Sequence, residues 1–427
     1  MSDGAATAHL YRPMMMTVLR EGYGLGDLRK DVLAGLTVAI VALPLSMAIA
    51  VASGVSPERG LYTSIIGGFL VSALGGSRFQ IGGPAGAFIL LVAATGSKFG
   101  PDGLLLTILL SGMALALLGA LRLGSLIRHI PHAVTVGFTS GIAVTILASQ
   151  LKDFGGLTLS GAEPGPLLPK LAMLADALPT LNPAAFAAGL GSAALIFVMR
   201  ALRPGWPGML IAVALASAVV AFWHLPVETI GSRFGGLPHS LPQPHLPVIN
   251  SQLLLHILPA VFSFTLLGGV ESLLSAKVAD GMTGRKHRSN MELVAQGLAN
   301  IASSFFGGIS VTGNIARTAT NIRAGARSPF SGMMHSGFLL LFILVAAPLA
   351  SFVPLAALAG VLVVVCWNMA EKKEFWRLLG HWQEAAVLIA TFVLTFLKDL
   401  TFGIVAGCAL AAIFALVLKR GVPEEGY

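Results

Sequence analysis

The stretch Val261–Ala279 reads VFSFTLLGGVESLLSAKVA, and it is long and apolar enough to cross a bilayer. One acidic residue, Glu271, stands near its middle. A carboxylate at that depth is costly, and ionisable residues inside membrane spans usually face a protein interior or a water-filled path. We therefore expect the function of this protein to involve Glu271.

The composition of the whole chain indicates a membrane protein with many spans. Of its 427 residues, 55% are hydrophobic and only 11% are charged, and the mean hydropathy is +0.83. Soluble domains carry about 25% charged residues. The first 30 residues contain no apolar core of a signal peptide. The two cysteines, Cys366 and Cys408, lie in apolar runs and are interpreted as small hydrophobic residues rather than as a disulfide or metal site.

Fourteen apolar segments follow one another along the chain, and most of them have the length that a spanning helix needs. We place them near 32–53, 60–75, 84–98, 104–122, 132–151, 183–200, 208–224, 253–279, 290–306, 312–322, 330–352, 354–370, 384–397 and 400–419. The sequence thus predicts an all-α polytopic fold with fourteen transmembrane segments, preceded by a short interfacial helix around Pro13–Glu21. The segments that start at 84 and 312 are short and rich in glycine and small polar residues.

The basic residues are distributed unequally between the two sides of this arrangement. If the N-terminus is cytoplasmic and the segments alternate, 20 of the 27 Lys and Arg residues fall on the inner side and 6 on the outer side, with Arg317 left inside a span. Cytoplasmic loops of membrane proteins carry such an excess. We therefore expect a multi-pass protein of the cell's inner (plasma) membrane with both termini in the cytoplasm. The net charge of +8 then reflects basic loops rather than nucleic-acid binding.

These segments divide the chain into two halves of seven spans. Residues 1–31 form a cytoplasmic N-terminal segment, 32–224 a first repeat, 225–252 an external connection, 253–419 a second repeat and 420–427 a cytoplasmic tail. Because seven is odd, the second half must be inverted relative to the first. Val261 in the first span of the second half lies 229 residues after Val32 in the first span of the first half, and Thr312 lies 229 residues after Gly83 at the two weak segments. Interrupted helices in corresponding positions of two repeats indicate the binding site of a secondary transporter.

The interrupted segments, Ile81–Phe88 (IGGPAGAF) and Ser310–Thr320 (SVTGNIARTAT), have residues suited to a helix start that contacts a ligand. Helix N-termini carry partial positive charge and unpaired N–H groups, which favour anions. The alternative is that these small residues only allow helices to pack closely. We favour the site, and the predicted substrate-binding residues are Gly83, Pro84, Ala85, Gly86, Thr312, Gly313, Asn314, Ala316 and Arg317, with Ser46 of the first span as a hydroxyl donor.

Two charged residues inside the spans have several possible roles. Arg317 can bind an oxyanion through its guanidinium, or pair with Glu271 as a structural ion pair. Glu271 shares a helix face with Ser275, four residues later. It can exchange a proton in each transport cycle, because desolvation disfavours its charged form. It can also bind Na⁺ together with Ser275, or only balance Arg317. No metal or other cofactor is expected, and H⁺ is the favoured coupling ion over Na⁺.

Four stretches of the chain resemble the sulfate permease family of anion transporters. They are LPLSMAIAVASGVSPERGLYTSIIGG at 43–68, IGGPAGAF, LLGGVESLLSAKVADGMTGRKHRSNMELVAQGLANI at 266–301, and GGISVTGNIARTATNIRAGARSP at 307–329. The resemblance implies a 7+7 inverted repeat like that of uracil permeases. It also implies a core domain of spans 1–4 and 8–11, a gate domain of spans 5–7 and 12–14, a homodimer and elevator-type alternating access.

The resemblance also bears on individual residues. Glu271 falls on the family's acidic position in span 8 and looks like that of proton-coupled bacterial members, whereas Na⁺-coupled bicarbonate carriers have Asp there. Arg317 falls on a substrate-facing arginine. Leu45 and Ile49 stand where many relatives have Gln and Tyr, which puts a hydrogen bond from span 1 to the substrate in doubt. Relatives usually end in a cytosolic STAS domain, whereas this sequence stops at Tyr427.

The sequence therefore predicts H⁺-coupled secondary active transport of a small anion such as sulfate, bicarbonate or a dicarboxylate. The alternatives are a Na⁺-coupled bicarbonate symporter and an uncoupled exchanger or channel. A uracil or purine permease of this architecture would need acidic residues in both spans 8 and 10, and Arg317 lies in the second of these. The spans show no nucleophile–base pair or metal cluster, so we do not expect an enzyme. The expected partners are the anion, the lipid bilayer and a second copy of the chain, without nucleic acid.

Overall fold

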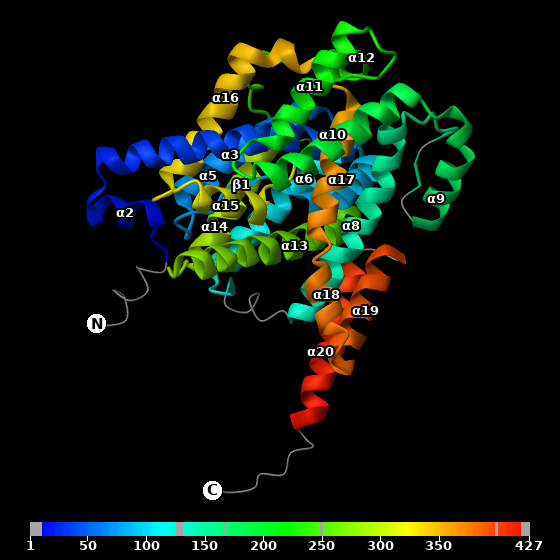
Figure 1. The fold of residues 1–427 in the computed structure, drawn as a ribbon. Coiled ribbons are helices and arrows are strands. Elements are labelled where there is room, and N and C mark those ends of the chain that lie inside the picture. The colour runs from blue at the N-terminus through cyan, green and yellow to red at the C-terminus, as the bar shows by residue number, and fades with distance from the viewer. Residues whose placement is uncertain are drawn as a thin grey trace, which may run out of the picture.

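The computed structural model describes residues 11–124, 131–161, 163–164, 167–247, 251–397 and 400–419. The predicted tail at 420–427 and the first ten residues of the predicted N-terminal segment lie outside the described residues. The described chain is almost entirely helical and includes two very short strands (Figure 1).

The first half of the chain contains nine α-helices, two 3-10 turns, one π-helical turn and one strand within the described ranges. In chain order they are α2 (Met14–Gly22), α3 (Leu25–Ala52), α4 (Pro57–Tyr62), the π turn η1 (Thr63–Gly67), α5 (Gly68–Leu74), β1 (Gly82–Gly83), η2 (Gly86–Phe88), α6 (Ile89–Ala120), α8 (His132–Gly155), α9 (Leu167–Asp176), η3 (Leu178–Thr180), α10 (Pro183–Leu202) and α11 (Gly208–Phe222).

The second half follows the same plan. Its elements are α12 (Ile230–Phe234), α13 (Ser251–Thr283), α14 (Ser289–Phe305), β2 (Thr312–Gly313), α15 (Ile315–Arg323), α16 (Phe330–Ala350), α17 (Leu355–Met369), α18 (Lys372–Leu378), α19 (Trp382–Leu397) and α20 (Leu400–Lys419). Each of the fourteen predicted segments coincides with helical structure. Among the described residues, seven helices are long and apolar enough to cross a membrane alone, and three further apolar helices are shorter.

Several element ends follow local sequence signals. The side chain of Asn182 accepts hydrogen bonds from the first backbone N–H groups of α10, and Pro183 takes the first helical position. Helix α8 ends at Gly155, and Gly156, which caps it, has a left-handed backbone. The predicted spans 84–98 and 104–122 form one run, α6, which is interrupted at Gly100, where φ is 73° and Pro101 follows. The predicted boundary is therefore a break inside α6.

The helices form two groups. Helices α3, α5, α6, α13, α14, α15 and α16 pack on one another and form the core, whereas α8, α10, α11, α17, α19 and α20 form the gate. Figure 1 shows the core elements at the left and centre and α17 to α20 at the right. Core and gate contact each other where α17 and α11 pack on α3 and where α8 reaches η2. The core and gate predicted by resemblance are thus two packed units.

Contacts between distant loops confirm that the segments alternate in direction. Residues that the alternation places on one side meet there: Arg288 N donates to Gly76 O at 3.0 Å, and Tyr11 Oη donates to Ala120 O at 2.6 Å. We call this the N-terminal face. On the opposite face, Leu355 N donates to Glu228 O at 2.9 Å. Helix α3 begins and helix α13 ends at the N-terminal face, so these corresponding helices of the two halves run in opposite directions.

Glycine allows two core helices to approach until their backbones touch. A Cβ on Gly297 of α14 would lie 2.5 Å from the carbonyl oxygen of Gly112 and 2.5 Å from the backbone nitrogen of Ala116, both on α6. Small residues at such contacts are typical of membrane helix pairs. The core therefore depends on the absence of a side chain at this position.

Gly297→Ala should destabilise the protein, because the new methyl group overlaps backbone atoms that cannot turn aside. Overpacking of this kind costs about 1–3 kcal/mol. Gly337→Ala on α16 is the matched control, since no atom lies within 4 Å of its Cβ position. Thermal melting of the purified protein in detergent should show a lower melting temperature for the first variant and an unchanged or higher one for the second. An unchanged melting temperature for Gly297→Ala would contradict the close packing.

Candidate functional site

The two interrupted segments meet at the centre of the core. Strands β1 and β2 pair antiparallel, with Gly82 opposite Gly313 and Gly83 opposite Thr312. Gly83 and Thr312 are also the two positions that the 229-residue offset makes equivalent, so the pseudo-twofold axis of the repeats passes between them. The strand pair is thus the point where the two halves of the protein join.

Side chains of the surrounding helices hold these strands in place. The amide of Asn300 on α14 donates to Val311 O at 2.8 Å and accepts from Val311 N at 2.9 Å. On the other side, Gly313 N donates to Ser272 Oγ on α13 at 3.2 Å, and Gln80 Nε2 donates to Ser272 O at 3.2 Å. Because all five residues are buried, these bonds make the strand pair a fixed part of the core.

A helix begins directly after each strand. The 3-10 turn at Gly86 leads into α6, and α15 begins after Asn314, whose side-chain oxygen accepts from Arg317 N at 3.1 Å. Of the predicted substrate residues on these segments, Gly83, Pro84, Ala85, Gly86, Thr312 and Gly313 are buried, Asn314 is half-buried and Ala316 is exposed. A Cβ on Gly86 would lie 3.2 Å from Sδ of Met369 on the gate helix α17. The first helix start therefore lies directly against the gate.

Arg317 lies behind the strand pair and is fully buried. Its Nη1 donates to Ser64 Oγ at 3.0 Å and its Nη2 donates to Ser46 Oγ at 2.9 Å. Its guanidinium also lies against Gly83, where a Cβ would be 2.2 Å from Nη1. The predicted hydroxyl of Ser46 is thus bound to Arg317 and to the carbonyl oxygen of Ala42.

The charge of Arg317 is not balanced by a direct ion pair in the described part of the chain. No carboxylate there lies within 4.0 Å of the guanidinium, and Nε has no hydrogen-bond partner among those residues. Arginine stays protonated in proteins, so the core holds a full positive charge solvated by two hydroxyl groups. Arg317 and Glu271 therefore do not form the structural ion pair that was one of the predicted alternatives.

Glu271 instead lies beside strand β2. Its carboxylate is half-buried and accepts a hydrogen bond from Thr312 Oγ1 at 3.3 Å. Ser275, one turn later on α13, is fully buried and donates to Thr318 Oγ1 of α15 at 3.3 Å. Both predicted coupling-ion residues thus point toward the segment that carries β2 and α15, where they contact different residues.

The sequence analysis did not identify four residues that shape this site, namely Ser64, Ser272, Gln80 and Asn300. Ser272 adjoins Glu271, Gln80 directly precedes the segment Ile81–Phe88, and Asn300 lies within a predicted span, so a search for amides next to the interrupted segments and inside spans would have found Gln80 and Asn300. Ser64 gives no such signal, because serine is common in membrane helices and its partner is 253 positions away.

The sequence and the fold were compared with known proteins. The profile of the sulfate permease family matches residues 28–414. The chain is 43% identical over 396 residues to the putative sulfate transporter YvdB of Bacillus subtilis. This alignment covers 92% of this chain and 74% of YvdB. The chain is 32% identical over 419 residues to the bicarbonate transporter BicA of Picosynechococcus. This alignment covers 93% of this chain and 72% of BicA.

Solved structures show the same architecture. The transmembrane domain of a cyanobacterial bicarbonate transporter BicA matches with a TM-score of 0.79 at 29% identity, over 90% of this chain and 98% of that one. The murine Slc26a9 anion transporter in the inward-facing state matches with a TM-score of 0.86 at 20% identity. This match covers 98% of this chain and 73% of the Slc26a9 chain. The second likeness concerns the fold alone. Together with the match of the family profile, these similarities show that the chain belongs to the sulfate permease family of membrane anion transporters.

Proposed function

We propose that this protein takes up a small anion, sulfate or bicarbonate, by secondary active transport driven by an H⁺ gradient. The observation that carries the proposal is the buried guanidinium of Arg317, which is held by hydroxyl groups directly behind two helix starts joined by a strand pair. The names of two similar proteins, a putative sulfate transporter and a bicarbonate transporter, support the choice of anion.

The electrostatics of the site favour an anion over a cation. The starts of η2 and α15 lie at the strand pair, and helix starts carry partial positive charge that favours anions. Arg317 adds a full charge in a medium of low dielectric constant, where it is weakly screened. An anion bound in front of Gly83 and Thr312 would neutralise the positive charge of Arg317, which has no carboxylate partner in the described core.

Glu271 supplies the proposed coupling. Its carboxylate lies next to β2, and its one direct contact in the described chain is with a hydroxyl group. In its charged form it repels an anion at the helix starts, and in its protonated form it does not. Anion and proton would then bind together and move together, which is the thermodynamic basis of symport.

The proposed movement is an elevator-type displacement of the core against the gate, in a homodimer with both termini in the cytoplasm. Core and gate are separately packed units that contact through a few elements. The contact of Met369 with Gly86 lies at their boundary. Na⁺ coupling through Glu271 and Ser275 is the alternative, because Ser275 donates its hydroxyl hydrogen to Thr318 Oγ1 and keeps its oxygen lone pairs available for a cation.

Glu271→Gln should abolish accumulation driven by a pH gradient, because the amide cannot release or take up a proton. Exchange of labelled for unlabelled anion should persist, since the anion site is intact. Uptake into proteoliposomes under imposed H⁺ or Na⁺ gradients measures both. Glu374→Gln on α18 is the control, because Glu374 lies outside the core. Gradient-driven accumulation by Glu271→Gln at the wild-type level, or accumulation driven by Na⁺ alone, would refute the coupling.

Arg317→Met should weaken anion binding by roughly tenfold or more, the size expected from losing about 1.4 kcal/mol of attraction. The fold should survive, because the hydroxyls of Ser46 and Ser64 are 2.8 Å apart and can bond each other. Arg323→Met on the same helix is the control, since Arg323 is exposed. Concentration dependence of sulfate and bicarbonate uptake, together with thermal melting, tests this expectation. An unchanged half-saturation concentration in a folded Arg317→Met variant would exclude an electrostatic role.

A further inference from the structure

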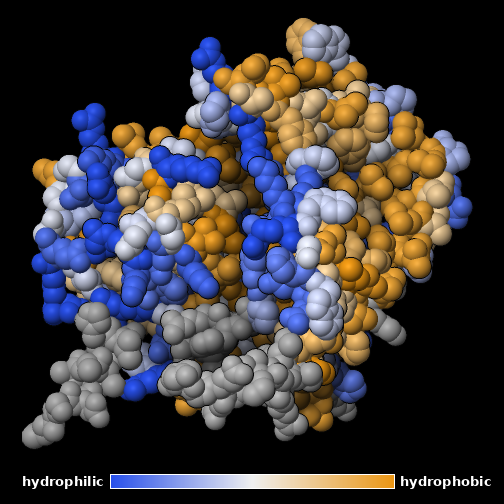
Figure 2. All heavy atoms as spheres, turned by 60° about the horizontal axis from the view of Figure 1, so that its bottom comes forward, coloured by the Kyte–Doolittle hydropathy of each residue, from blue (hydrophilic) through white to orange (hydrophobic). Residues whose placement is uncertain are grey.

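A second polar site lies at the N-terminal face, away from the strand pair. A pocket of about 290 Å³ is enclosed by α2, the segment 77–79, Asp280 at the end of α13 and the loop 285–288. All of these elements belong to the core or pack on it. Figure 2 shows hydrophilic residues gathered at the left of the molecule, on the side where Figure 1 places α2.

The walls of this pocket carry more positive than negative charge. Its basic residues are Arg78, Arg285, Lys286 and Arg288, beside His287, whereas its acidic residues are Glu21 and Asp280. Both carboxylates are already engaged. Glu21 accepts from Arg78 Nη2 at 2.5 Å, and Asp280 binds Nδ1 of His287 at 2.6 Å.

The loop after α13 adds three further cations, Arg285, Lys286 and Arg288, to a pocket whose two carboxylates are already paired. Within the described ranges, Arg285 and Lys286 have no carboxylate within 4.0 Å. Arg288 donates to the carbonyl oxygen of Arg12 at 2.6 Å and to the hydroxyl of Thr17 at 2.8 Å. Partial burial and the nearby guanidiniums of Arg12 and Arg78 lower the pKa of Arg288, which reflects the concentration of positive charge.

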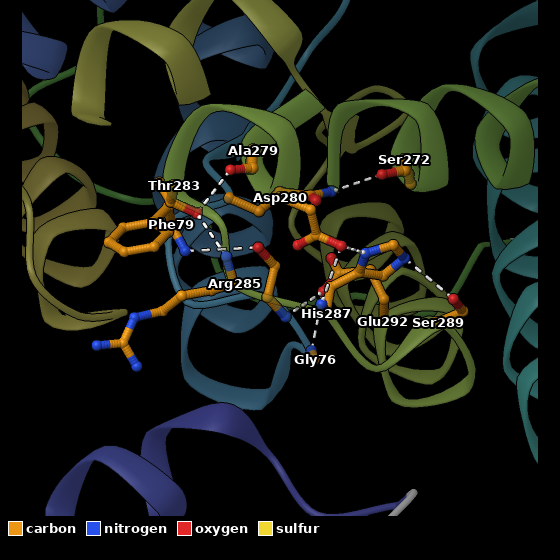
Figure 3. A network of polar contacts seen from close by, with 12 residues as sticks. Gly76, Phe79, Ser272, Ala279, Asp280, Thr283, Arg285, His287, Ser289 and Glu292 are labelled. Atoms are coloured by element: carbon orange, nitrogen blue, oxygen red, sulfur yellow. Dashed lines mark hydrogen bonds and ion pairs between the residues drawn. The ribbon is translucent and has the colours of Figure 1, made fainter. Parts of the chain in front are cut away.

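The floor of the pocket is built from buried, satisfied contacts. Glu292 of α14 accepts from Gly76 N at 2.8 Å and from Ser77 N at 2.9 Å. Arg288 N in turn donates to Gly76 O at 3.0 Å, which joins the two loops. Figure 3 shows this network, with the guanidinium of Arg285 extending away from it. These hydrogen bonds fix the backbone at the floor of the pocket. The guanidinium of Arg285, which has no carboxylate partner among the described residues, projects from it.

The surroundings place this pocket at a lipid surface. Helix α2 buries Met14 and Val18 against the protein and exposes Met16 and Leu19, each by about half. Leu25, at the start of α3, is also exposed. An apolar outer face next to a basic pocket is the arrangement of a helix that lies in the membrane interface, where anionic headgroups are found.

We propose that this pocket binds a phosphate group, with the phosphodiester of an anionic lipid headgroup as its source. Arg285 and Lys286 contact the phosphate oxygens, and Arg288 and Arg78 form the back of the pocket. Basic pockets beside membrane helices on the basic side of the protein suit such headgroups. The site is separate from the strand pair, and it does not depend on which anion is transported or on the coupling ion.

The test compares Arg285→Gln/Lys286→Gln with Arg29→Gln/Lys30→Gln in the purified full-length chain. Both double variants lose two exposed cations near the N-terminal face, and only the first pair lines the pocket. Short-chain phosphatidylglycerol, phosphatidylcholine and inorganic phosphate are titrated separately, and the rise in melting temperature gives an apparent Kd. Melting without ligand confirms that both variants are folded.

Phosphatidylglycerol should bind about tenfold or more weakly to the pocket variant than to wild type, because two interfacial cations are lost. The control variant should bind it like wild type, and phosphatidylcholine should not distinguish the three proteins. If inorganic phosphate alone shows the difference, the phosphate site stands and its lipid source is wrong. If neither anion distinguishes the pocket variant from the control, the proposal is overturned.

Discussion

The arrangement of the core depends on stabilising the buried guanidinium of Arg317 by hydrogen bonds from the protein in place of water. Arg317 is fully buried, and burying a charge costs several kcal/mol unless close partners compensate. Two serines of the first half provide hydrogen bonds, whereas a carboxylate would have cancelled the charge. Hydroxyl groups stabilise the cation and leave its positive potential in place. An anion carrier needs that combination, because a neutralised site would not attract its substrate.

The two halves contribute different chemistry to a site that is symmetric in its backbone. The pseudo-twofold axis passes between Gly83 and Thr312, and each strand is followed by a helix start. The charged groups, Glu271 and Arg317, both come from the second half, and the first half supplies Ser46 and Ser64 as partners of the guanidinium. The repeat thus provides two helix starts that follow a shared strand pair, and under the proposed function the asymmetric side chains would let the anion and the proton bind at different positions.

Hydropathy and glycine placement were sufficient to predict the fold, because both are local properties of a membrane chain. Predicted and observed spans agree closely at most ends, and Gly83 and Thr312, which are 229 residues apart, are strand partners, although no strand was predicted. The direction of the Arg317 side chain was not predictable. Its partners are set by how α3 and η1 pack against α15, and no periodicity in the sequence encodes the contact with Ser64. The same applies to Glu271, whose hydrogen bond with Thr312 replaces the ion pair with Arg317 and leaves proton and Na⁺ coupling as its two predicted roles.

The two proposed anion sites place different demands on the core. At the proposed central site an anion would have to bind reversibly, and the cation there is buried behind the strand pair rather than exposed. The pocket at the N-terminal face is formed by α2 and by loops that Glu292 ties together, and all of these pack on the core. A headgroup bound there would move with the core and would not bridge it to the gate. Lipid occupancy would then influence where the core rests relative to the membrane surface, while the packing between core and gate stays free to change.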